Sequence, residues 1–151
     1  MTTVCFVGGS DVDLRYELLS RETARDALAT YDLRAPFDNT VAVDTVSLGA
    51  AVSLCNDLNW YLVRFTDAVL IREPSVDDDE WLSRSLATAV RNDDVRATET
   101  DRLLKVYGVD DGRLVEPMYV ARSDDAPLPE YDLRDVEETV RVRVTESEFE
   151  A

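Results

Sequence analysis

The chain has 151 residues, which suits one domain that buries about 68–70% of the surface exposed by its unfolded chain. Its 32 Asp and Glu residues outnumber its 16 Lys and Arg residues, giving a formal net charge of −16 that disfavours nucleic-acid binding, since Lys and Arg neutralise the phosphates. No stretch approaches the roughly 18 to 20 apolar residues that span a bilayer. No basic residue precedes Arg15, as a secretory signal would require. We therefore expect a cytoplasmic protein without a membrane partner.

The basic residues are also unusual, because Lys105 is the only lysine and arginine supplies the rest. An acidic, arginine-dominated composition resembles that of proteins from extreme halophiles. At about 1 M salt the Debye length is about 3 Å, so self-repulsion within the chain is screened. Because halophilic nucleic-acid binders are acidic too, the charge disfavours a nucleic-acid partner without excluding it.

The composition excludes several kinds of catalytic and metal site. The chain has no histidine, so it has no Ser/His or Cys/His catalytic pair and no imidazole ligand for zinc. Cys5 and Cys55 lie in apolar segments, where we expect two buried free thiols. No GxxxxGK[ST] pattern surrounds Lys105. The sequence therefore predicts no catalytic residue, no metal site and no cofactor.

The N-terminal region contains an apolar run that ends in two glycines. Residues 2–7 are typical of a strand, and residues 12–18 alternate between apolar and charged side chains, which predicts a second strand. The intervening GGSD then forms a hairpin turn. The alternative is an anion-binding loop made by Gly8, Gly9 and Ser10 ahead of a helix.

Helices and strands alternate through the middle of the chain. Ser20 is placed to cap a helix that runs to about Tyr31. The remaining predicted elements are a strand at 41–46, an apolar helix at 47–58, and β-rich runs at 60–65 and 68–73.

The last half of the chain is predicted to hold two helices and two strands. Ser75 and Asp78 resemble a capping box for a helix that ends near Arg91. A second helix is expected to end at Gly108. The predictions that follow are a turn at Asp111-Gly112, a strand at 113–122, an extended linker at about 123–135, and a C-terminal edge strand carrying Val140, Val142 and Val144.

This order of elements predicts an α+β fold. We expect one domain over residues 1–151, with a mixed, largely antiparallel sheet and helices packed on one face. The alternative is a small α/β fold in which residues 12–18 join the first helix.

Polar and aromatic side chains interrupt the two most apolar segments. Asn56, Asp57 and Asn59 precede Trp60 and Tyr61. Polar groups at such a point either cap the helix and form a turn or line a pocket. These five residues are therefore candidates for a ligand or interaction site.

Charged side chains supply the remaining candidates. Arg64 and Arg72 interrupt the predicted core strands, where they either form surface ion pairs or bind an anion through two parallel hydrogen bonds. The four carboxylates from Asp77 to Glu80 lack the spacing of a calcium loop and lie at a predicted helix start. We expect them to cap that helix.

The segment VSLGAAVSLCNDLNWYLVRF, residues 46–65, is similar to that of an uncharacterised protein family confined to haloarchaea. The resemblance extends through LSRETARDALATYDL, KVYGV and RVTESEFE. It implies a halophilic archaeal cytoplasm and an unassigned role, and it transfers no catalytic or binding residue.

Two classes of function follow from these observations. The favoured one is a noncatalytic interaction or regulatory module that docks an unknown protein partner, or a second copy of itself, through the Trp60-Tyr61 region or the terminal strand. The alternatives are a metal-assisted hydrolase that uses Asp57 with Asp11 or Asp13, and an anion- or nucleotide-binding protein.

Overall fold

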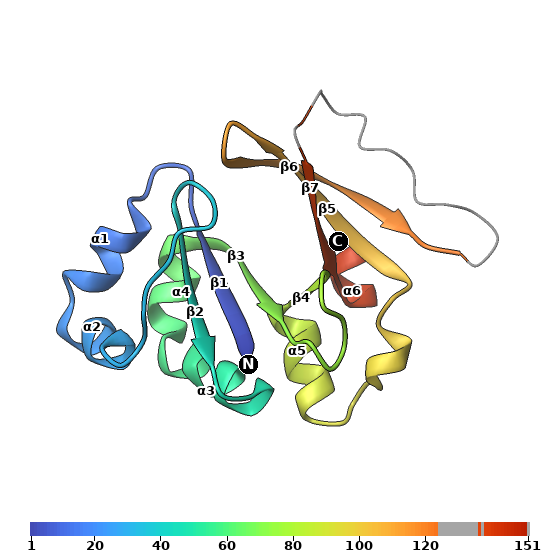
Figure 1. The fold of residues 1–151 in the computed structure, drawn as a ribbon, viewed down its shortest axis with the longest axis horizontal. Helices are drawn as coiled ribbons and strands as arrows, with labels where there is room; N and C mark the ends of the chain where they lie inside the picture. Colours follow the sequence, from blue (N-terminus) through green and yellow to red (C-terminus); the bar gives the residue numbers. More distant parts are fainter. Residues whose placement is uncertain (124–135, 137, 151) are drawn as a thin grey trace.

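The computed structural model describes residues 1–123, 136 and 138–150, in which helices cover a sheet of strands (Figure 1). The strands are β1 (Thr2–Gly8), β2 (Thr40–Thr45), β3 (Thr66–Arg72), β4 (Trp81–Ser83), β5 (Leu103–Asp110), β6 (Arg113–Ala121) and β7 (Glu138–Arg143). The helices are α1 (Leu14–Leu19), α2 (Glu22–Leu28), α3 (Leu48–Asp57), α4 (Asn59–Phe65), α5 (Arg84–Arg91) and α6 (Glu146–Glu150), and a 3-10 helix spans Ala97–Glu99.

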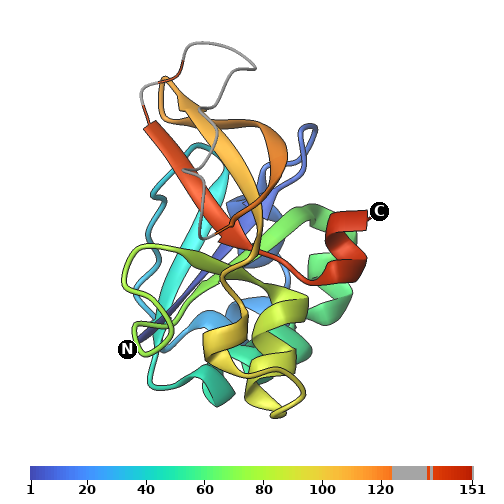
Figure 2. The same ribbon diagram turned by 90° about the vertical axis from the view of Figure 1, so that its right-hand side faces the viewer.

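The seven strands form one sheet in the order β2-β1-β3-β4-β7-β5-β6. Strands β4 and β7 are parallel, and the other strand pairs within the described residues are antiparallel. The α+β prediction with a mixed, largely antiparallel sheet is therefore confirmed. The β5–β6 hairpin extends beyond the layer of helices, as Figures 1 and 2 show.

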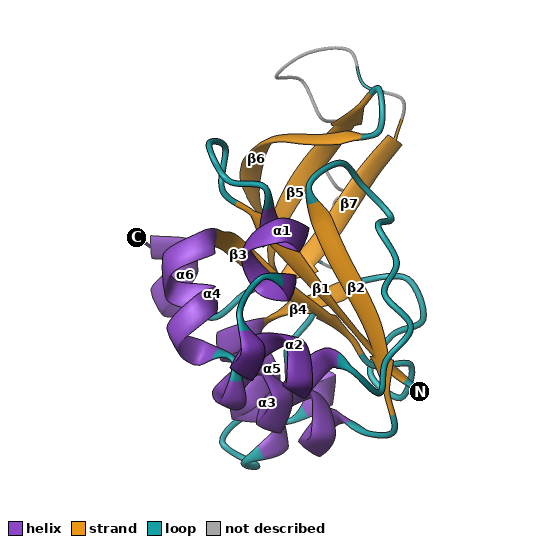
Figure 3. Ribbon diagram, turned by 90° about the vertical axis from the view of Figure 1, so that its left-hand side faces the viewer, coloured by secondary structure: helices purple, strands orange, loops and turns teal. Residues whose placement is uncertain are grey.

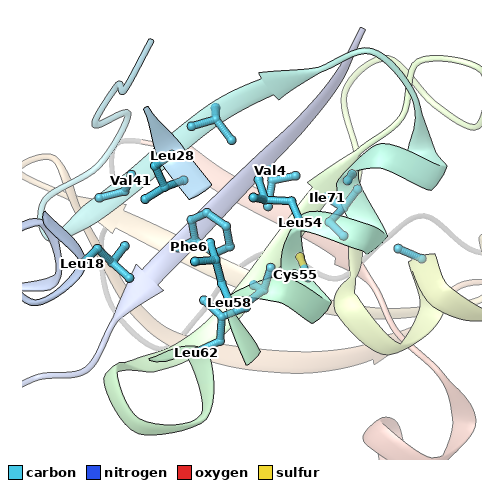
Figure 4. Close-up of a cluster of buried hydrophobic side chains, with 14 of the residues drawn as sticks. Val4, Phe6, Leu18, Leu28, Val41, Leu54, Cys55, Leu58, Leu62 and Ile71 are labelled. Atoms are coloured by element: carbon cyan, nitrogen blue, oxygen red, sulfur yellow. The ribbon is translucent and has the colours of Figure 1, made fainter. Parts of the chain in front are cut away.

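Helices α1 to α5 lie on one face of the sheet (Figure 3). Side chains of a strand alternate between faces, so Val4 and Phe6 of β1 point toward the helices while Cys5 belongs to the cluster on the opposite face. Figure 4 shows Phe6 among leucines of the helical layer, including Leu58 and Leu62. Helices α1 to α5 thus cover one face of β1, β2 and β3. No helix in the described part of the chain covers the other face of these three strands, although Phe149 of α6 packs against the cluster on that side.

The hairpin predicted after β1 is wrong. Residues 14–19 form α1, and the Asp13 side chain caps it by accepting a hydrogen bond from the Tyr16 amide at 3.2 Å. Leu14 and Leu18 are fully buried, whereas Tyr16 is 65% exposed. The alternating pattern fits a short helix equally well, because one buried stripe needs only two leucines four residues apart. Strand β2 occupies the place beside β1 that the hairpin would have filled.

The strand predicted at 60–65 is also wrong, because these residues form α4. Leu58 and Leu62 are buried four residues apart against the core, and the helix ends where β3 begins. Burial of one helical stripe outweighs the β-propensity of the aromatic and branched residues in this segment.

Three predictions in the last half of the chain need correction. Trp81 and Leu82 belong to β4, and the helix starts only after Ser83, whose hydroxyl accepts a hydrogen bond from the Leu86 amide. The segment that ends in Gly108 belongs to a strand, β5, because β6 and β7 pair with its two edges. For the same reason β7 is an internal strand between β4 and β5, where an edge strand was expected.

The turn predicted at Asp111-Gly112 is confirmed. Their φ angles of 53° and 78° are those of a two-residue hairpin turn, and they join β5 to β6. The helix predicted from Ser20 is shorter than expected, since α2 starts at Glu22 with Arg21 at its N-cap. Most of the predicted linker, residues 124–135, lies outside the described residues.

Candidate functional site

The two glycines after β1 form a structural junction. The Gly8 amide donates to the Asn39 carbonyl at 2.9 Å, and the Gly9 amide donates to the Phe65 carbonyl at 3.0 Å. A side chain at Gly8 would meet the Asn39 side chain at 2.6 Å, so this close approach requires glycine. Ser10 is exposed beside them. The two backbone amides that would bind an anion in the anion-loop alternative therefore donate to backbone carbonyls instead.

The polar residues predicted as a pocket or a turn lie where α3 meets α4. Asn56, Asp57 and Asn59 are exposed at the surface. The Asn56 side chain accepts a hydrogen bond from Arg84 of α5 at 3.3 Å, which ties this junction to the neighbouring helix. The structure therefore places these residues on the surface of a helix junction.

An aromatic and basic surface follows on α4. Trp60 is 51% exposed and Val63 is 69% exposed. The Arg64 guanidinium lies 3.9 Å from the centroid of the Trp60 ring and donates to the Trp60 carbonyl at 2.9 Å. Arg21 lies on the same ring at 5.8 Å, and the Tyr61 ring meets it edge-on at 5.0 Å. We call Trp60, Val63 and Arg64, with the neighbouring Arg21, the α4 surface.

A groove of about 480 Å³ lies on the helix-free face of the sheet. Its floor follows one row of neighbouring residues across the strands, since Thr3 of β1 pairs with Asp44 of β2 on one side and with Arg72 of β3 on the other. Arg34, which precedes β2, and Trp81 of β4 also line the groove. The groove therefore gathers side chains from segments that are far apart in the sequence.

Hydrogen bonds within the groove hold Asp44 in place. Arg34 donates to both carboxylate oxygens of Asp44 at 2.8 and 2.9 Å, and the Thr3 hydroxyl donates to one of them at 2.7 Å. The Arg34 bonds, followed by the Thr3 bond, lower the pKa of Asp44. Arg72 stacks over the Trp81 ring at 4.6 Å. Its guanidinium forms no hydrogen bond or ion pair with any other described residue.

The two cysteines are buried and free, as predicted. Burial raises the pKa of the Cys5 thiol to about 12 and that of Cys55 to about 11. Because the thiolate is the nucleophile, both groups are unreactive near neutral pH. Among the residues with described positions, no three His, Cys, Asp or Glu side chains are grouped so that they could hold a metal ion.

A buried charged cluster was not predicted from the sequence. Glu80 is 8% exposed and accepts hydrogen bonds from Arg143 at 2.8 Å and Arg122 at 2.6 Å, with Arg141 at 3.7 Å. Arg143 also donates to Thr100 at 3.0 Å. We call these residues the Glu80 cluster; it joins the parallel pair β4 and β7.

The carboxylates expected to cap a helix have other partners. The Asp77 side chain accepts from the amides of Asp79 and Glu80 at 2.9 and 2.6 Å, which forms a turn before β4. The signal in the sequence for the buried cluster is Arg143 among alternating valines, since an internal strand that buries an arginine must supply a partner for it.

The fold and the surfaces together define an α+β protein whose sheet carries helices on one face and an open groove on the other. The chain belongs to the family of unknown function DUF5804, whose model matches residues 2–109. Comparisons with curated proteins and with solved structures found no match. The matched residues contain the α4 surface and, apart from Met1, the lining of the groove. No helix in the described part of the chain is long and apolar enough to cross a membrane.

Proposed function

We propose that the protein is a noncatalytic interaction module that docks a protein partner through the α4 surface. The observation that carries the proposal is Trp60, which is half exposed with the Arg64 guanidinium stacked on its ring, while Arg21 lies between this ring and that of Phe65. Tryptophan and arginine are the residues most enriched among those that dominate binding energy in protein interfaces. Val63 adds apolar area on the same helix.

The charge of the α4 surface indicates the chemistry of the partner. Arg64 forms no ion pair within the described residues, and it brings positive charge to the surface of a chain with a net charge of −16. An acidic partner is therefore attracted to this helix and repelled by the rest of the molecule. The partner that fits is a protein segment with an apolar side chain flanked by carboxylates.

We also propose that the protein works in the cytoplasm of a halophilic archaeon. The support is the composition, since strong acidity and a single lysine suit a chain that stays hydrated in molar salt. At about 1 M salt, attraction between charges is screened beyond about 3 Å, so an interface there relies on apolar and stacked contacts and on ion pairs in direct contact. The mixture of Trp60, Val63 and stacked arginines meets that requirement.

Affinity capture from a haloarchaeal lysate tests the proposal. Wild-type protein and the Trp60→Ala variant are immobilised in about 2 M KCl, a concentration at which surface repulsion is screened. Val46→Ala is the matched control, because Val46 is 81% exposed in the loop between β2 and α3. A partner retained by the wild type and by Val46→Ala but lost with Trp60→Ala supports the proposal. Capture that is the same for all three proteins contradicts it.

A further inference from the structure

The groove on the helix-free face contains an unbalanced positive charge. Asp44 is neutralised by the two hydrogen bonds from Arg34 and is further held by Thr3. Arg72 lines the same groove and its charge also acts on Asp44, but it forms no hydrogen bond or salt bridge with a carboxylate of the described residues. Two guanidinium groups and one carboxylate line the groove together with the N-terminal residue Met1, so positive charge is in excess there although the chain has twice as many acidic as basic residues.

The position of Arg72 is fixed by stacking. Trp81 is only 6% exposed, so its ring is a rigid platform, and the Arg72 guanidinium lies over it at 4.6 Å. Stacking uses the face of the guanidinium and leaves the N–H groups at its edge available. A planar carboxylate matches this edge through two parallel hydrogen bonds.

Apolar side chains form the rest of the lining. Pro36, Phe37 and Pro74 line the groove beside the charged row. A volume of about 480 Å³ lies within the range of about 300–1,000 Å³ typical of small-molecule sites. The groove therefore has room for a small molecule with an apolar body.

We infer that this groove is a binding site for a small monocarboxylate with an aromatic or apolar body. The carboxylate pairs with the edge of Arg72, and the body lies against Phe37 and Pro36. A phosphate has no apolar body to lie against Phe37 and Pro36, so a carboxylate that carries such a body fits the lining better. This site is separate from the α4 surface, since the two lie on opposite faces of the sheet, and it does not depend on the proposed docking function.

Titration with phenylacetate tests the inference. The chain has two tryptophans, so a Trp60→Phe background leaves Trp81 as the only indole reporter beneath Arg72. Fluorescence and calorimetry are measured in about 2 M KCl with phenylacetate, with 2-phenylethanol as the neutral analogue, and with inorganic phosphate. We expect saturable binding of phenylacetate, no saturable binding of 2-phenylethanol, and weaker binding of phosphate.

Two arginine variants connect the binding to the groove. Arg72→Gln is expected to weaken phenylacetate binding at least about tenfold, since it removes charge-assisted hydrogen bonds. Arg96→Gln is the matched control, because Arg96 is an exposed arginine that does not line the groove. The affinity of this variant for phenylacetate should stay within about twofold of the parent. If Arg72→Gln does not fold, Arg72→Lys takes its place, keeping the charge and losing the paired donors.

Several results would overturn the inference. One is the absence of saturable phenylacetate binding, and another is equal affinity for phenylacetate in Arg72→Gln, or in Arg72→Lys if that variant is used. A third is phosphate binding as tight as that of phenylacetate, which would assign the groove to a phosphate ligand.

Discussion

The substitution Glu80→Gln is the most demanding test of the buried cluster. Glu80 and Arg143 are 8% and 6% exposed, and their closest contact is 2.8 Å. The amide has nearly the shape of the carboxylate but carries no charge, so Arg143 stays buried after losing its main counter-charge. Breaking a buried pair by removing one partner costs about 3–5 kcal/mol. Because Asp77 stays 3.4 Å from Arg143, we expect the free energy of unfolding to fall by about 3 kcal/mol, the lower end of this range.

The assay is urea unfolding followed by circular dichroism in about 2 M KCl, where the wild type is expected to be folded. For a chain of this length, a loss of about 3 kcal/mol corresponds to a drop in melting temperature of about 6–12 °C. Glu146→Gln is the control, because the Arg102–Glu146 pair has a similar distance, 3.2 Å, but its side chains are 63% and 75% exposed. An exposed pair contributes about 0–1 kcal/mol. Equal losses for the two variants would refute the reasoning that burial makes the Glu80 cluster important.

Two further predictions follow from charge. The melting temperature of the wild type should rise steeply from about 0.1 to 3 M KCl. The reason is that the Debye length falls from about 10 Å to below about 3 Å, so that repulsion within a chain of net charge −16 is screened. A melting temperature that does not change with salt would contradict the proposed halophilic habitat. Hydrogen bonds from the Glu80 and Asp79 amides and the nearby Arg143 guanidinium lower the pKa of Asp77 from its ordinary value of 3.8. Its contribution to stability is therefore present above about pH 4 and is lost as the pH falls through the lower folded pKa. Unfolding measured from about pH 6 to 3 should show a shallower acid loss for Asp77→Asn, which keeps the turn but removes the charge; a slope identical to that of the wild type would contradict this account.

Local pattern was enough to predict several elements. Strands β1 and β2, helix α3 and the Asp111-Gly112 turn lie where the sequence placed them. Two of the wrong predictions concern short segments whose apolar residues fit both the period of a strand and the period of a helix. In α1, and at the start of α4, two buried leucines four residues apart stabilise a helix, although the residues of these segments alternate in polarity or have a high propensity for strands.

Long-range pairing explains the other errors. Nothing local in Leu103 to Asp110 shows that two strands pair with it, and that pairing is what makes the segment a strand. The same limit applies to the groove. The sequence marked Arg72 as an anion candidate, but Arg34, Asp44 and Trp81 join it only because the sheet order brings β2, β1, β3 and β4 side by side.

Part of the α4 surface was predicted from the sequence. Trp60, Tyr61 and Arg64 were candidates because polar and aromatic residues interrupted apolar segments. Val63 and Arg21 were not, since a strand would have placed Val63 differently and no pattern links Arg21 to Trp60. Packing of α1, α2 and α4 on one face of the sheet creates this surface.

The most direct test of the docking function is the dissociation constant of the captured partner for the wild type and for Trp60→Ala. Calorimetry with the purified partner in about 2 M KCl gives both values. A residue that dominates an interface contributes about 2 kcal/mol or more, so Trp60→Ala should weaken binding about 30-fold or more while Val46→Ala leaves it within about twofold. Equal dissociation constants for the wild type and Trp60→Ala would contradict the proposal that the protein docks its partner through the α4 surface.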